Sequence, residues 1–285
     1  MTSVTKLPTS NGSGKPRLIL LASLLGTLTV SACTSSTSIP SEIARIETEQ
    51  GSAENIGSLT AVIRSNPNDP VAYNVRGSAF GKSGSYNDAL RDFDKAIQLN
   101  PRYFEAYANR ALIHRIKGDL AAAATDYNNA LQINPRYDKA YVGRGELYRR
   151  AGRTNEAFND FQKAIQLDTT DPRAYHRRGL IYQSRKQHDF ALDDFATAIS
   201  LAPNSPEPYN GRAISYIALG QIDNAFDAVN FAISLDDKNA ESWANQALLW
   251  EQKGEIDKAR KSYRRALQLN ANFEPARNGL NRIGG

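Results

Sequence analysis

The chain has little of several residue types that other classes of protein need. Its 285 residues include one cysteine, Cys33, so no disulfide bond can form within the chain. Its three histidines lack the spaced cysteine or histidine partners of a zinc site, and no apolar run reaches the roughly 20 residues of a membrane-spanning helix. With 41% hydrophobic and 23% charged residues, the composition is that of an ordinary globular protein. It excludes a disordered tail, a collagen-like fibre and a multi-span membrane protein.

Acidic residues are absent from the first 32 residues, which contain Lys6, Lys15 and Arg17. These residues supply three of the five net positive charges, which leaves +2 for everything that follows. Nucleic-acid binding would need lysine and arginine clustered on the folded part of the chain. The charge balance therefore does not predict a nucleic-acid partner.

The N-terminal segment has the order of a secretory signal. Polar and basic residues 1–17 precede residues 18–30, which are uncharged, largely apolar and too few to span a membrane. Val30, Ser31 and Ala32 then lead to Cys33, an arrangement that resembles the bacterial lipobox. The resemblance implies cleavage before the cysteine and its acylation. The alternative is an ordinary signal, cut after Ala32, that leaves a free thiol.

This resemblance implies where the protein is found. Residues 1–32 are then a lipoprotein signal peptide, and residues 33–51 are the lipidated cysteine and a flexible, Ser/Thr-rich tether. In families of bacteria with two membranes, a residue other than aspartate after the cysteine, here Thr34, implies the outer membrane. We therefore expect a lipid-anchored protein of the bacterial envelope that faces the periplasm.

A period of 34 residues organises the rest of the chain into six units without insertion or deletion. The aromatic residue that opens each unit is Tyr73, Tyr107, Tyr141, Tyr175, Tyr209 and Trp243 in turn. A small residue follows four positions later, at Gly77, Ala111, Gly145, Gly179, Ala213 and Ala247. Such regularity over six units indicates a repeat architecture.

Within each unit the apolar spacing is helical. In the first unit Tyr73, Gly77 and Phe80 share one face of a helix, and Ala89 and Phe93 begin the same pattern again. A glycine separates the two patterns in five units, as suits the end of a helix, and a lysine replaces it in the fourth unit. Each unit is therefore predicted to form two helices.

These residues resemble the tetratricopeptide repeat (TPR) family over residues 70–273. The resemblance implies an all-α fold, a right-handed superhelical solenoid of antiparallel helix pairs built from six units of 34 residues. Residues 52–69 keep a second-helix pattern and are predicted to form an N-terminal capping half-repeat, and residues 274–285 a C-terminal capping helix. Because one unit cannot bury its apolar face alone, neighbouring units are expected to stabilise one another.

The repeats depart from the family in one systematic way. Where the family often has leucine before the small residue, the first five units have arginine, and the first four also carry an aspartate in the second helix. The matched residues are Arg76 with Asp92, Arg110 with Asp126, Arg144 with Asp160, and Arg178 with Asp194. This co-occurrence favours a repeated structural ion pair over the alternative, a row of ligand-binding groups.

The chain lacks the residue patterns of common catalytic sites. No G-x-S-x-G is present, and the GSGK at residues 12–15 lacks the upstream glycine of a phosphate-binding loop. His114 occupies an aromatic position of the repeat and is predicted to be a packed histidine rather than a ligand. We therefore expect a binding protein that is not an enzyme and needs no cofactor or metal.

In the TPR family the first helix of each unit lines a concave groove. The resemblance implies that units two to four present seven side chains to this groove: Arg115, Lys139, Arg149, Arg150, Arg173, His176 and Arg177. Units five and six present Glu207, Glu241 and Glu251 instead. The groove is predicted to be basic in its middle, where it would bind acidic residues or a C-terminal carboxylate of a partner. The alternative is that these charges only keep a long surface hydrated.

The sequence matches the family's chaperone-type carboxylate clamp only in part. Asn74, Asn109 and Lys139 resemble three of its five members, whereas Ser78 and Gly143 replace the other two. A reader of chaperone tails is therefore not expected.

Three functions fit this pattern. The first is a membrane-anchored scaffold that binds partner proteins or peptides during envelope assembly, as an adaptor for peptidoglycan hydrolases or proteases. The second is a pilotin-like assembly factor for the secretin of a pilus or secretion system. The third is a regulatory subunit that completes the active site of an envelope enzyme. Self-association into homo-oligomers is a further structural alternative.

Overall fold

The structure, a computed structural model, describes residues 50–284, and these contain fourteen α-helices and no strand. The helices are α2 (Ala53–Ser65), α3 (Pro70–Lys82), α4 (Tyr86–Leu99), α5 (Phe104–Lys117), α6 (Leu120–Ile133), α7 (Asp138–Arg150), α8 (Thr154–Gln166), α9 (Pro172–Ser184), α10 (His188–Leu201), α11 (Pro206–Ala218), α12 (Ile222–Leu235), α13 (Ala240–Gln252), α14 (Ile256–Leu269) and α15 (Glu274–Arg282). Each 34-residue unit contributes one odd-numbered and one even-numbered helix, so the predicted all-α class and helix pairing are confirmed.

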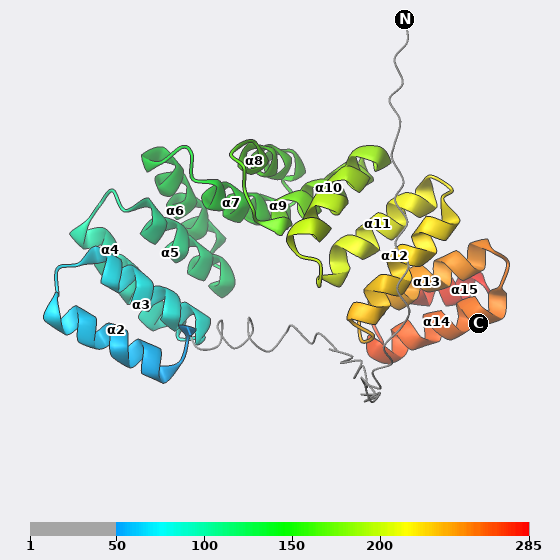
Figure 1. Cartoon of the computed structure of the whole chain (residues 1–285), viewed down its shortest axis with the longest axis horizontal. Coiled ribbons are helices and arrows are strands. Elements are labelled where there is room, and N and C mark those ends of the chain that lie inside the picture. The colour runs from blue at the N-terminus through cyan, green and yellow to red at the C-terminus, as the bar shows by residue number, and fades with distance from the viewer. Residues whose placement is uncertain (1–49, 285) are drawn as a thin grey trace, which may run out of the picture. The chain divides into compact units, whose positions relative to one another are not determined.

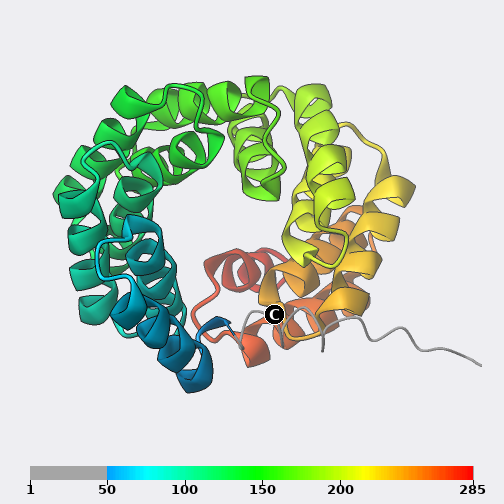
Figure 2. The ribbon, with the colours of Figure 1, turned by 60° about the vertical axis from the view of Figure 1, so that its left-hand side comes forward.

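Consecutive helices pack against each other along the whole described chain (Figure 1). Odd-numbered helices of most neighbouring units also contact one another, whereas no comparable contact joins successive even-numbered helices of residues 50–284. The rows of helices follow a curved path (Figure 2). Because closer spacing belongs to the inner side of a curve, the odd-numbered helices line that side.

The turn inside each unit follows the pattern expected from the sequence. Gly118, for example, ends α5 with a φ of 87°, a left-handed conformation that glycine adopts without steric cost. Lys186 occupies the corresponding position of unit four with a φ of 60°. The repeat geometry therefore imposes the left-handed turn even where the sequence supplies a side chain.

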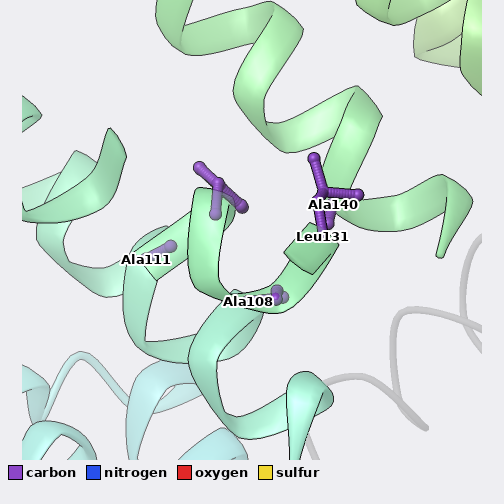
Figure 3. Packing of buried hydrophobic residues seen from close by; sticks show 6 residues of the cluster. Ala108, Ala111, Leu131 and Ala140 are labelled. Atoms are coloured by element: carbon purple, nitrogen blue, oxygen red, sulfur yellow. The ribbon is translucent and has the colours of Figure 1, made fainter. Parts of the chain in front are cut away.

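Small residues let the helices approach closely, and aromatic side chains fill the space beside them. One cluster joins units two and three: Ala108 and Ala111 of α5, Tyr127 and Leu131 of α6, and Ala140 of α7 are all buried (Figure 3). Similar clusters recur along the chain. The hydrophobic core is thus continuous from unit to unit, which is how a repeat array gains stability that no single unit has.

The predicted arginine–aspartate pairs are formed in all four units. In unit two, Nε of Arg110 donates to Oδ2 of Asp126 at 2.7 Å and Nη2 donates to Oδ1 at 2.6 Å. The same two-bond geometry joins Arg76 to Asp92, Arg144 to Asp160, and Arg178 to Asp194. Because each pair joins the two helices of one unit and leaves no free carboxylate, its role is structural.

The predicted capping segments contain α2 and α15, at the two ends of the described array. The predicted signal peptide, Cys33 and nearly all of the tether lie outside the described residues. Within residues 50–284, no helix has the length and apolar character needed to cross a membrane.

Candidate functional site

The seven groove residues predicted from the sequence come from three odd-numbered helices. Arg115 lies on α5, residues Lys139, Arg149 and Arg150 on α7, and residues Arg173, His176 and Arg177 on α9. Two neighbouring hollows bring five of them together. Arg115, Lys139 and Arg173 line a hollow of about 350 Å³, and Arg173, His176 and Arg177 line one of about 230 Å³. Arg149 and Arg150 line neither.

Glu146 neutralises part of the basic surface. This buried carboxylate accepts from Nη2 of Arg149 at 3.2 Å and from Nε of Arg177 at 2.9 Å. Glu146 is not among the residues predicted from the sequence, although the sequence contains a signal for it. At the same position of units two, four, five and six stand Leu112, Leu180, Ile214 and Leu248. A carboxylate that interrupts an apolar row marks a place where nearby cations find a partner inside the chain.

Arg173 is also paired within the chain. Its Nε donates to Oδ1 of Asp171 at 2.9 Å and its Nη2 to Oδ2 at 2.5 Å, while Asp171 also caps the start of α9. Lys139 and Arg150 are exposed and have no ion pair among residues 50–284. The cationic groups that a partner could meet without breaking an internal pair are therefore fewer than the sequence suggests.

The hollow around Arg115 owes part of its wall to an unusual linker. After α8 ends at Gln166, Asp168 adopts a left-handed φ of 61° and the N–H of Thr169 donates to the carbonyl of Ala164 at 3.3 Å. Units one, two and four have proline at the Thr169 position, which has no N–H to donate. The linker turns inward here, and Thr169 becomes buried.

Tyr127 also lines this hollow. Its ring is buried and lies directly against Gly143 of α7, where a larger residue would collide with it. Burial raises the pKa of Tyr127, and the positive charge of Arg115 opposes that shift. The phenol and the guanidinium are therefore close neighbours in the hollow.

His176 is neutral at neutral pH. Burial lowers its pKa to about 4, and the charge of Arg177 adds to the effect. Its ring centre is 5.9 Å from that of Phe195, in a tilted arrangement. This histidine therefore contributes packing, and no positive charge, to the basic part of the groove.

The C-terminal part of the inner face carries the carboxylates of Glu207 and Glu241. Burial raises the pKa of Glu241, and the negative charge of Glu207 adds to the shift. Glu241 lines a hollow of about 410 Å³ together with Ile214, Leu248 and Phe273. Glu251, by contrast, accepts two hydrogen bonds from Arg282 of α15 and is thus engaged by the C-terminal helix.

The first two units add an apolar hollow of about 320 Å³. Gly81 of α3, Phe93 of α4 and Leu112, Ile113 and Ile116 of α5 line it. Along the inner face, an apolar hollow, the basic hollows and a hollow lined by both Glu241 and Arg282 therefore follow one another from the N-terminal to the C-terminal end. Among the described residues, no group of three His, Cys, Asp or Glu side chains has the arrangement of a metal site.

Two sequence families match this array. A profile described as a tetratricopeptide repeat matches residues 74–138, and one described as the cilia and flagella-associated protein 70 C-terminal domain matches residues 137–272. Hsp70-Hsp90 organizing protein 2 from Arabidopsis thaliana is 31% identical over 65 residues, which is 23% of this chain and 11% of the relative. The chain thus matches only a small part of this curated relative.

Solved structures share the fold over longer stretches. The hetero-tetramer Cut9-Hcn1 of the APC/C contains a chain with a TM-score of 0.70 and 19% identity, and the match covers 85% of this chain and 48% of that one. PilW, described as a widely conserved type IV pilus biogenesis factor, has a TM-score of 0.63 and 19% identity over 74% of this chain and 98% of its own. The repeated helix pairs, the family profiles and these shared folds agree: the chain belongs to the tetratricopeptide repeat family.

Proposed function

We propose that this protein is a non-catalytic scaffold that binds segments of partner proteins along the inner face of its repeats. The observation that carries the proposal is the series of hollows on successive odd-numbered helices: an apolar hollow, then one with an excess of cations, then a largely apolar one that contains Glu241 and Arg282. An enzyme concentrates its polar groups in one site, whereas this face distributes them along the array. An extended or helical peptide is the ligand that can contact several such hollows at once.

Proteins that share this fold support a protein partner. The Arabidopsis relative is named as an organizer of Hsp70 and Hsp90, and the Cut9-Hcn1 structure is a complex of two kinds of chain. The basic part of the face suits acidic residues of a partner, because Lys139 and Arg150 are exposed and unpaired within the described chain. Exposed charges contribute only about 0.2–1 kcal/mol each, so the apolar hollows supply the remaining affinity.

We place this scaffold in the bacterial envelope, anchored through Cys33 and facing the periplasm, with the outer membrane as its membrane. The lipobox-like residues Val30 to Cys33 support this location. An adaptor for peptidoglycan hydrolases or proteases is the first candidate role. A pilotin-like role is the second candidate, because PilW, a type IV pilus biogenesis factor, shares the fold over 74% of this chain.

The anchor is tested by growing producing cells with labelled palmitate. The wild-type chain is expected to incorporate the label and a Cys33→Ala variant to lose it, with Ser36→Ala as a control that keeps it. A wild-type chain without label, whose Cys33 reacts with a thiol reagent after secretion, would contradict the anchor.

The binding face is tested with two matched double variants of the full chain. Lys139→Glu/Arg150→Glu changes the inner face, and Lys261→Glu/Arg264→Glu makes the same change of charge on α14, an even-numbered helix. Partners are captured from envelope extract by crosslinking, and the crosslinked residues are mapped. Crosslinks to odd-numbered helices that disappear only in the first variant support the proposal. Crosslinks to even-numbered helices that disappear only in the second would overturn it.

A further inference from the structure

Arg115 is a buried cation without an ion-pair partner among residues 50–284, and its polar neighbour is the phenol of Tyr127. Only 9% of this residue is exposed, and its Nε is buried with no hydrogen-bond partner among the described residues. No carboxylate of residues 50–284 forms an ion pair with its guanidinium. Withdrawing a charge from water is costly unless it is paired, so the structure leaves an arginine prepared for an anion.

In other units, a polar side chain at the position equivalent to Arg115 forms a hydrogen bond or an ion pair within the chain. In unit three Arg149 donates to Glu146, and in unit four Gln183 donates to the hydroxyl of Ser215 at 2.9 Å. In unit six Glu251 accepts from Arg282. The residues that correspond to Glu146 and Ser215 around Arg115 are Leu112 and Leu147, whose side chains have no polar atoms. The residue that corresponds to Arg282 is Glu146, which Arg149 and Arg177 already engage, so the polar neighbour left to Arg115 is the phenol of Tyr127.

The hollow next to Arg115 has a defined shape. Tyr127 and Gly143 form one wall and the linker residues Thr169 and Thr170 another, around a volume of about 350 Å³. Five charged side chains line this hollow, and all five contribute to its net charge. Three cations, Arg115, Lys139 and Arg173, face two carboxylates, Asp138 and Asp171. The excess of one positive charge favours a singly charged anion over a doubly charged phosphate.

An apolar hollow adjoins this one. Asn109 and Leu112 line both hollows, and Leu112 and Ile116 of the second hollow are exposed. The second hollow measures about 320 Å³, and Phe93 also lines it. A carboxylate beside Arg115 and an apolar side chain beside Ile116 are thus within reach of one short peptide segment.

We propose that Arg115 binds a carboxylate of a partner peptide, with an apolar side chain of the same peptide in the adjoining hollow. The guanidinium offers paired donors that match the two oxygens of a carboxylate, and the bond strengthens because Arg115 is largely buried. This proposal rests on the proposed function, since it names the chemistry that one part of the inner face recognises. The carboxylate is either the C-terminus of the peptide or an acidic side chain.

Three acetylated peptides distinguish these sources. The first is Ala-Ala-Ala-Leu with a free C-terminus, the second is the same peptide amidated, and the third is amidated Ala-Glu-Ala-Leu. Each is titrated into the full chain, and the Nε–Hε signal of Arg115 is followed by nuclear magnetic resonance with the amide signals of Leu112 and Gly143. A saturable shift of all three signals is expected with the first or the third peptide and not with the second. The tighter of the two identifies the source of the carboxylate.

Variants test whether the arginine itself is responsible. Arg115→Met is expected to weaken the binding about tenfold or more, Arg115→Lys to restore part of it, and Arg264→Met on α14 to bind like the wild type. Equal binding by wild type and Arg115→Met, or equal shifts with the amidated peptide, would overturn the carboxylate site. If peptides then shift signals of α7 or α9 instead, the proposed binding face stands without this site. If they shift no signal of any odd-numbered helix, the carboxylate site fails, and the crosslinking experiment above decides the function.

Discussion

Two arginines of the same helix, five residues apart, have opposite surroundings. Arg110 points between α5 and α6, where it forms two bonds to Asp126 and a third, from Nη1 to Oδ1 of Asp94, at 2.6 Å. Arg115 points to the inner face and has no such bond within the described chain. Each guanidinium nitrogen of Arg110 is therefore bonded to a carboxylate inside the fold. The charge of Arg115 has no carboxylate to pair with among residues 50–284, and its polar neighbour there is the phenol of Tyr127.

An unpaired arginine is not by itself a binding site. Arg212 of unit five also has a buried Nε without a partner among residues 50–284, because Ala228 stands where the earlier units have aspartate. Its guanidinium lies over the ring of Tyr209 at 5.2 Å from the ring centre. What distinguishes Arg115 is the hollow beside it, which gives an anion room to enter.

The largest effect is expected where a structural pair is broken. Arg110→Met leaves Asp126, with 4% of its side chain exposed, as a buried carboxylate without its main partner. Removing one member of a buried pair costs about 3–5 kcal/mol, and the partial exposure of Arg110 puts the expected loss near the lower end. Urea denaturation measures it. Arg212→Met is the matched control, because this arginine has no aspartate partner that the substitution would leave unpaired. It should change the free energy of unfolding by less than about 1 kcal/mol.

A smaller loss of stability is expected when the pH is lowered, because His176 is buried without a charge on the inner face. Its pKa falls from 6.5 in the unfolded chain to about 4 in the folded protein, mainly through burial. Between these values the unfolded state binds more protons, so stability is present above pH 6.5 and is lost as the pH falls toward 4. The full shift corresponds to roughly 3 kcal/mol, and partial exposure reduces it.

His176→Asn is the variant that isolates this contribution, because units one and five carry asparagine at the same position. Between pH 7 and pH 5 the wild type should lose more unfolding free energy than the variant by about 1–2 kcal/mol. The carboxylates are common to both proteins and cancel in this difference. Parallel stability curves would show that His176 takes up a proton in the folded groove.

Much of the fold could be predicted because the repeat copies its constraints six times. Arg76 and Asp92 are sixteen positions apart, and the same spacing recurs in three further units. Such repetition reveals a contact between two helices before any coordinates exist. The period likewise indicated the helix pairs and the helix end near Gly118.

The site could be predicted only in part, because its decisive features break the repeat. The family pattern placed Arg115 and Lys139 on one face. It did not indicate that Glu146 holds Arg177, a contact between neighbouring units that depends on how two long side chains meet. Nor did it indicate the inward turn at Asp168, since this linker is as long as the others and the replacement of proline by Thr169 does not by itself specify a left-handed turn.

The smallest effect has the opposite sign and sharpens the comparison between the two arginines of α5. Arg115→Met removes an unpaired buried charge and replaces it with a flexible apolar side chain of similar length. Apolar replacement of buried ionic groups is often neutral or stabilising, so the ligand-free variant should gain about 1 kcal/mol in urea denaturation. The same substitution at Arg110 is expected to destabilise the protein, so the two variants should change the free energy of unfolding in opposite directions. A loss of stability comparable to that of Arg110→Met would mean that Arg115 supports the fold, and would remove the reason to regard it as reserved for a ligand.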